Sequence, residues 1–211
     1  MGNIFRNINS NSIMRQVVIL LDEPIKFILL LMLVLTLIMV GELVAEFLQR
    51  RYIDIKATRI INKLKDSTKN TEEVINNSKL LPAHKDILLE VTKHKNFSNE
   101  MKENLAVAVL DNYERRLDVR IKRTEMIVRL GPVFGLLGTL IPLGPGIIAL
   151  AQGDTLTLSN SLISAFDTTV IGLICAAIST VLTSIRKNWY DKDKIMLVLI
   201  MEAILENEEG K

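Results

Sequence analysis

Hydroxyl-bearing and small side chains follow one face of the apolar segment 161–185, and they are the groups of this chain best suited to chemistry. They recur at spacings of three and four residues, as expected for one face of a helix: Ser161, Ala165, Thr168, Gly172, Cys175, Ser179 and Thr183. Thr169 flanks this face. A hydroxyl both donates and accepts hydrogen bonds. Such a row inside hydrocarbon suits either close helix packing or a narrow polar path.

Asp167 stands in the same segment. A carboxylate at the centre of a membrane helix costs about 2.5–3.5 kcal/mol on insertion scales. Two readings stay open: Asp167 faces a water-filled cavity or a partner charge, or it lies shallow enough to reach headgroup water. Helical spacing places it with Ser164 and Asn160, on a different face from Thr169.

A second apolar segment, 126–151, carries glycines on one face. Gly131 and Gly135 form a small-xxx-small pair, and Gly138 with Thr139 extends nearly the same face. Together with Gly172 of the other segment, they predict closely packed membrane helices. They do not predict a phosphate-binding loop, because no strand precedes them.

Other chemistries find no support in the sequence. No nucleophile–base set or metal-ligand spacing is present, and Cys175 is the only cysteine. His84 and His94 lie in a charged region and are expected to be solvated. Basic residues are interleaved with acidic ones, and the net charge of +2 indicates nothing about nucleic acid. We expect no enzyme activity, no cofactor and no metal.

The elements that position these residues are three predicted membrane spans, 25–48, 126–151 and 161–185, each about the length a bilayer core requires. Before them, residues 1–24 contain a short apolar face (Ile13, Val17, Leu20) that predicts a helix lying in the outer interface; an unstructured tail is the alternative.

Lys and Arg cluster beside the ends of the spans that face the cytoplasm. They follow the first span, precede the second and follow the third: Arg50, Arg51, Lys56, Arg59, Arg115, Arg116, Arg120, Lys122, Arg123, Arg186, Lys187, Lys192 and Lys194. The loop 152–160 has none. We therefore expect the N-terminus and this loop outside, and residues 49–125 and 186–211 inside.

The interior segment 49–125 predicts helices only. Asn70 begins a capping-box pattern, Pro82 opens a helix that runs to residue 93, and Ser98 caps a long helix that continues into the second span. At the inner end of the first span, Glu46 is spaced to pair with Arg50.

These residues resemble a known family. RLGPVFGLLGTLIPL followed by LISAFDTTVIGLICAAISTVLTSI is similar to the MotA/TolQ/ExbB proton-channel family, over about residues 115–189. The resemblance implies a homopentamer whose second and third spans line a pore around a small ExbD-, TolR- or MotB-like partner bearing an essential Asp. It makes Thr139 and Thr169 the family threonines and Thr168 a neighbour without a fixed role. ExbB-like members carry a glutamate where this chain has Ser164.

The predicted protein is therefore all-α: a three-span inner-membrane subunit with long helices extending into a helical cytoplasmic domain. The ion-pathway candidates are Thr139, Thr169, Thr168, Asp167 and Ser164, with H⁺ or Na⁺ as the ion. It would convert an ion gradient into mechanical work or energise transport. The alternative is a non-conducting oligomeric membrane scaffold that recruits partner proteins.

Overall fold

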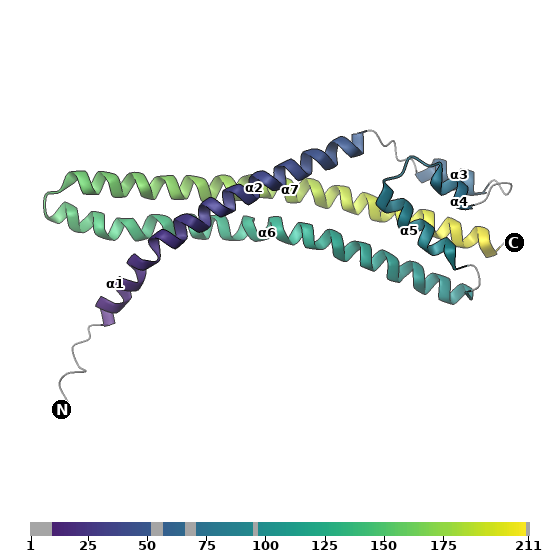
Figure 1. Cartoon of the computed structure of the whole chain (residues 1–211), viewed down its shortest axis with the longest axis horizontal. Helices are drawn as coiled ribbons and strands as arrows, with labels where there is room; N and C mark the ends of the chain where they lie inside the picture. Colours follow the sequence, from purple (N-terminus) through teal and green to yellow (C-terminus); the bar gives the residue numbers. More distant parts are fainter. Residues whose placement is uncertain (1–9, 52–56, 66–70, 95–96, 210–211) are drawn as a thin grey trace, which may run out of the picture. The chain divides into compact units, whose positions relative to one another are not determined.

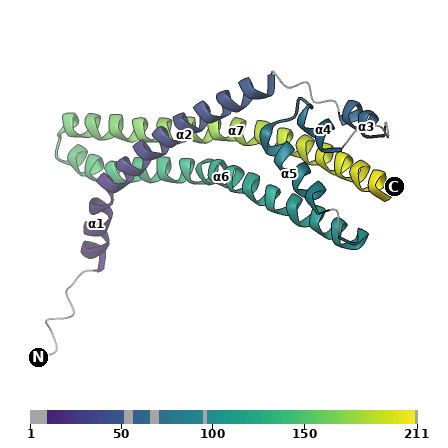
Figure 2. The same cartoon turned by 45° about the vertical axis from the view of Figure 1, so that its right-hand side comes forward.

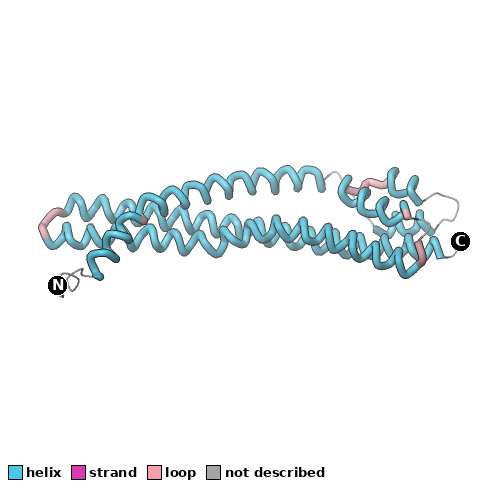
Figure 3. Tube along the Cα trace, turned by 60° about the horizontal axis from the view of Figure 1, so that its bottom comes forward, coloured by secondary structure: helices cyan, strands magenta, loops and turns pink. Residues whose placement is uncertain are grey.

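The computed structural model describes residues 10–51, 57–65, 71–94 and 97–209, and every regular element in these ranges is a helix (Figure 3). The helices are α1 (Ser10–Leu20), α2 (Asp22–Arg51), α3 (Ala57–Lys65), α4 (Thr71–Asn76), α5 (Pro82–Lys93), α6 (Asn99–Ala151) and α7 (Thr155–Glu209). Three stretches are long and apolar enough to cross a membrane: Ile13–Arg51, Asn99–Ala151 and Thr155–Asn207. The predictions of an all-helical chain and of three candidate spans are confirmed.

Local sequence sets several helix ends. The Ser98 hydroxyl accepts a hydrogen bond from the Met101 backbone N–H at 3.3 Å, and this cap starts α6. Pro82 occupies the first turn of α5, where its missing N–H costs nothing. α6 continues unbroken into the second apolar segment, as predicted, and stays helical to Ala151 with Pro142 and Pro145 inside it. Asn70, the start of the expected capping box, lies outside the described residues.

The connection between α6 and α7 is shorter than the expected loop 152–160, because α7 already begins at Thr155. Gly153 has φ of +79°, a left-handed conformation that glycine adopts without a steric penalty. The Asp154 carboxylate accepts a hydrogen bond from the Thr157 N–H at 3.0 Å and so caps α7. Hydrogen bonds from Thr157 also hold the pKa of Asp154 below its ordinary value.

The chain divides into two compact units, which we describe separately. The first holds the described residues up to Val40 together with Arg123–Thr183; the second holds the described parts of Gly41–Lys122 and Ser184–Lys211. In the first unit, α6 and α7 lie side by side and antiparallel, and α2 crosses the pair (Figures 1 and 2).

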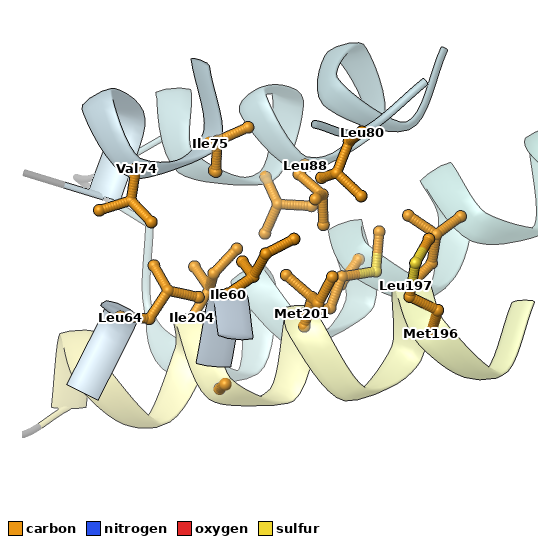
Figure 4. Close-up of a cluster of buried hydrophobic side chains, with 14 residues drawn as sticks. Ile60, Leu64, Val74, Ile75, Leu80, Leu88, Met196, Leu197, Met201 and Ile204 are labelled. Atoms are coloured by element: carbon orange, nitrogen blue, oxygen red, sulfur yellow. The ribbon is translucent and has the colours of Figure 1, made fainter. Parts of the chain in front are cut away.

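The second unit has its own apolar core, formed by α3, α4 and α5 packed on parts of α6 and α7. Ile75 and Leu88 are fully buried and lie opposite Leu197, Met201 and Ile204 of α7 (Figure 4). Each fully buried side chain of this size contributes about 1.5–3 kcal/mol. This core fixes the helices that carry the charged residues discussed below.

Candidate functional site

The glycines of α6 and α7 bring the two backbones of the first unit into close approach. A Cβ added to Gly131 would lie 2.7 Å from the carbonyl oxygen of Gly172 and 3.3 Å from the Cβ of Ala176. A Cβ added to Gly172 would in turn overlap that same part of α6, the Gly131 carbonyl oxygen. Only glycine fits at either position without moving a helix. We call this contact, which continues through Gly135 and Gly138, the α6–α7 seam.

Threonine hydroxyls lie along the same seam. The Thr169 hydroxyl donates a hydrogen bond to the Gly135 carbonyl oxygen at 3.2 Å, across the two helices. Gly138 faces Thr168, whose Oγ1 would lie 2.6 Å from an added Cβ. The Thr168 hydroxyl bonds to the carbonyl of Ala165 in its own helix, at 2.9 Å. Thr168 is therefore buried between the helices, and Thr169 joins them.

Helix α2 covers one side of the α6–α7 pair. Its residues Leu29 and Met32 are buried there. The side chains of α6 and α7 that form apolar clusters with α2 are Ile127, Phe134, Ile141, Ile171 and Cys175. In α6, three of them are spaced by seven residues, which keeps them on one face.

Thr139 and Thr169 lie away from this covered side. At 3.6 residues per turn, Thr139 is rotated about 140° around α6 from Phe134, and Thr169 about 160° around α7 from Ile171. Both side chains are half-buried. The Thr139 hydroxyl donates to the Leu136 carbonyl oxygen at 2.7 Å. We call the face of the pair that carries Thr139 and Thr169 the open side.

Asp167 and Ser164 belong to the opposite, α2 side. They line a groove of about 460 Å³, which we call the outer groove, with these residues: Lys26, Leu29, Leu30, Asn160, Ile163, Ser164, Asp167, Thr168 and Ile171. Asp167, Ser164 and Asn160 thus share a face, as their spacing predicts. The structure separates the five ion-pathway candidates into Thr139 and Thr169 on the open side and Asp167 and Ser164 in the groove, with Thr168 between them.

Further along the α6–α7 pair, two hydroxyls meet in the interior. The Thr183 Oγ1 lies 2.7 Å from the Thr124 Oγ1 and 2.8 Å from the Ser179 carbonyl oxygen, and both threonines are buried. Thr124 was not among the residues predicted from the sequence. It precedes Gly131 by seven residues and Gly138 by fourteen, which places it on the same face of α6 as these glycines. This spacing could have identified it from the sequence.

The second unit joins charged side chains of α2 and α7, most of them buried or half-buried. Arg50 makes two hydrogen bonds to the Asp193 carboxylate, at 2.6 and 3.0 Å, and one to Glu46 at 3.2 Å, which confirms the predicted Glu46–Arg50 pair. Arg186, only 2% exposed, bonds to Glu42 at 3.1 Å. The Arg50–Asp193 and Arg186–Glu42 pairs tie α2 to α7, two contacts that the sequence alone did not predict.

His84 corrects one prediction. It is fully buried rather than solvated, because α5 packs its inner face onto the core. Its Nε2 lies 3.0 Å from the Tyr113 hydroxyl and 3.6 Å from Asp193. Burial disfavours the ionised form of Asp193, but the polar interactions with His84 and Arg50 outweigh it and lower the pKa of Asp193. His94, in contrast, is only half-buried and stacks on Phe97.

Comparison with known proteins supplies the family. The model of the MotA/TolQ/ExbB proton channel family matches residues 68–196, more than half of the chain. No curated protein matches the chain closely enough to count as a relative. The match confirms the resemblance carried by the glycine and threonine motifs, and the apolar helices make this a multi-pass membrane protein. The chain belongs to the MotA/TolQ/ExbB proton channel family.

Proposed function

We propose that this protein is the proton-conducting subunit of an ion-driven membrane motor, and that the open side of its α6–α7 pair lines the ion path. One observation carries the proposal. α2 covers the side of the pair that bears Phe134 and Ile171, and it leaves uncovered the side that bears Thr139 and Thr169. In a ring of copies, this uncovered side is the one free to face a central axis.

Membership of the family supports a proposal for the assembly. We propose a homopentamer around the membrane span of a small partner, similar to ExbD, TolR or MotB, that carries an acidic side chain. The hydroxyls of Thr139 and Thr169 can accept a hydrogen bond from a protonated carboxyl group and donate one to a carboxylate. They would thereby stabilise both states of the partner's acid as protons pass.

The topology completes the proposal. Residues 1–24 and the α6–α7 turn lie on the extracytoplasmic side of the inner membrane. Residues 49–125 and 186–211 form a helical domain on its cytoplasmic side. One proton crossing a potential of 100 mV releases about 2.3 kcal/mol. A few protons per cycle are therefore enough to drive a modest movement of the partner.

The test is ion flux through liposomes that contain the protein and its partner, driven first by a pH gradient and then by a Na⁺ gradient. Thr139→Val and Thr169→Val remove the hydroxyls at nearly constant volume, and we expect each to reduce flux at least about tenfold, since general proton transfer by a positioned group contributes this much or more. Thr36→Val is the matched control. Its hydroxyl bonds to Met32 within α2 at 2.7 Å, away from the open side.

Asp167→Asn separates the two groups of candidates. Because Asp167 lies in the outer groove and not on the open side, we expect this variant to keep its flux. If flux survives Thr139→Val and Thr169→Val, the proposal fails and the non-conducting scaffold is favoured. The scaffold reading has its own support, since the hydroxyl of Thr168 is satisfied within the chain and needs no ion.

A further inference from the structure

Helix α1 does not pack against the apolar clusters found in the described part of its own chain. Its apolar side chains are exposed; Met14 is 69% and Leu20 is 75% exposed, and none joins an apolar cluster of the described residues. Figures 1 and 2 show α1 turning away from α2 at Leu21, clear of α6 and α7. An exposed apolar helix needs lipid or another protein surface to cover it.

The outer groove contains a charged side chain, Asp167, that has no partner among the described residues. Asp167 is exposed in the groove and makes no hydrogen bond or ion pair with the described part of the chain. Lys26, the cation across the groove, is already engaged: its Nζ lies 2.7 Å from Asp22 and 3.4 Å from Glu23. An unpaired carboxylate at membrane depth favours a cation from elsewhere.

On this side of the first unit, the described residues offer one other cation, Arg15 of α1. The α6–α7 turn contains no Lys or Arg. Arg15 is exposed and has no ion-pair partner among the described residues. Arg15 lies in α1, which turns away from α2 and clear of α6 and α7 (Figures 1 and 2), and so it lies away from the groove of its own chain. Arg15 of a neighbouring copy has no such restriction.

We propose that α1 of one copy docks in the outer groove of the next copy, with Arg15 paired to Asp167 and the apolar face of α1 on Leu30 and Ile163. The occupant is a second copy because the two surfaces complement each other in charge and in exposed apolar area: Ile163 is 57% and Leu30 56% exposed. The docked helix would link adjacent subunits at the outer edge. This inference rests on the assembly given in the proposed function.

The test uses two differently tagged chains in one membrane, both in a Cys175→Ala background. One chain carries Arg15→Cys and the other carries Asp167→Cys, so a disulfide between them can form only between copies. We expect a cross-linked heterodimer under mild oxidation. Phe166→Cys is the matched control: it neighbours Asp167, is 66% exposed, does not line the groove, and lies about 100° around α7 from Asp167. It should give little product.

Charge exchange tests the ion pair itself. Cross-linking between Val18→Cys and Ile163→Cys reports docking while leaving both charges in place. Arg15→Glu should lower this yield about two- to fivefold, and Asp167→Lys added to Arg15→Glu should restore it. An unchanged yield in Arg15→Glu, or equal products with the groove and control cysteines, would overturn the inference.

Native mass spectrometry of the same samples keeps the two proposals apart. A ring that forms without the cross-link refutes the docking of α1 and leaves the proposed function standing. Monomers only would refute both. A ring that retains phospholipid, and loses it in Asp167→Asn without any cross-link, would show that lipid fills the groove and would overturn the inference.

Discussion

Replacing Gly131 with alanine is expected to push α6 and α7 apart. The added Cβ would lie 2.7 Å from the Gly172 carbonyl oxygen, a backbone atom that cannot rotate away. Ordinary contact begins at 3.4 Å. The helices must therefore separate by about 0.7 Å at this point, and a gap of this size forfeits a quarter to a half of the dispersion energy of each contact that it opens.

Overpacking of this kind costs about 1–3 kcal/mol in protein cores. The cost matters more here because lipid tails are as apolar as the helices, so packing itself holds membrane helices together. The hydroxyl bond between Thr169 and Gly135, one turn away, would lengthen with the same movement. We therefore expect Gly131→Ala to lower both stability and ion flux.

Gly144→Ala is the matched control, since nothing lies within 4 Å of its added Cβ. It should gain about 0.5–1 kcal/mol from the higher helix propensity of alanine. The assay is thermal unfolding of both purified variants in the same detergent. The two variants should therefore differ by about 1.5–4 kcal/mol; for a chain of this length each kcal/mol shifts Tm by about 2–4 °C, so we expect Gly131→Ala to melt roughly 3–16 °C below Gly144→Ala. Equal melting temperatures would refute the close approach of the two backbones.

The remaining predictions concern buried polar contacts. Arg50→Met removes the cation that pairs with Asp193 and should lower the free energy of unfolding, measured in urea, by about 3–5 kcal/mol. The double variant Arg50→Met with Asp193→Leu should recover most of this loss. If it does not, the two residues do not act as a unit. Because the pKa of Asp193 is lowered in the folded state, its contribution is present above about pH 4 and is lost as pH falls through the folded value. The stability difference between wild type and Asp193→Asn should therefore shrink on acidification, and a constant difference would contradict the assignment. Thr124→Val and Thr183→Val should show a coupling of about 0.5–1.5 kcal/mol in a double-mutant cycle, whereas additive effects would mean that the two hydroxyls do not interact.

Much of the architecture follows from local patterns. The length of the apolar segments predicts three candidate spans, and the absence of helix breakers between Ser98 and Leu130 predicts that α6 enters the membrane segment without interruption. Local rules succeed here because a helix satisfies its backbone hydrogen bonds within itself, whatever surrounds it.

The charged residues show where local patterns stop. His84 and Asp193 lie in polar stretches of the sequence, and nothing in those stretches marks them as buried. They are buried because α5 packs on α7, and Arg50 of α2 meets Asp193 at the same place. Arg50 and His84 each lie more than a hundred positions from Asp193 in the sequence. Burial of a polar side chain depends on which helices meet, and sequence spacing within one helix does not contain that information.

At the candidate site, the positions of the hydroxyls and glycines, and the face of its own helix that each one occupies, can be read from the order of residues. It separated Asp167 from Thr169 for that reason, since helical spacing is a property of a single element. That α2 covers the face of Asp167 and leaves the face of Thr139 and Thr169 open is seen only once the three helices are packed together. The physical reason is that helical periodicity fixes only the angles between side chains around the axis of one helix. Which side of α6 and α7 is covered by α2 depends on how the side chains of all three helices pack together.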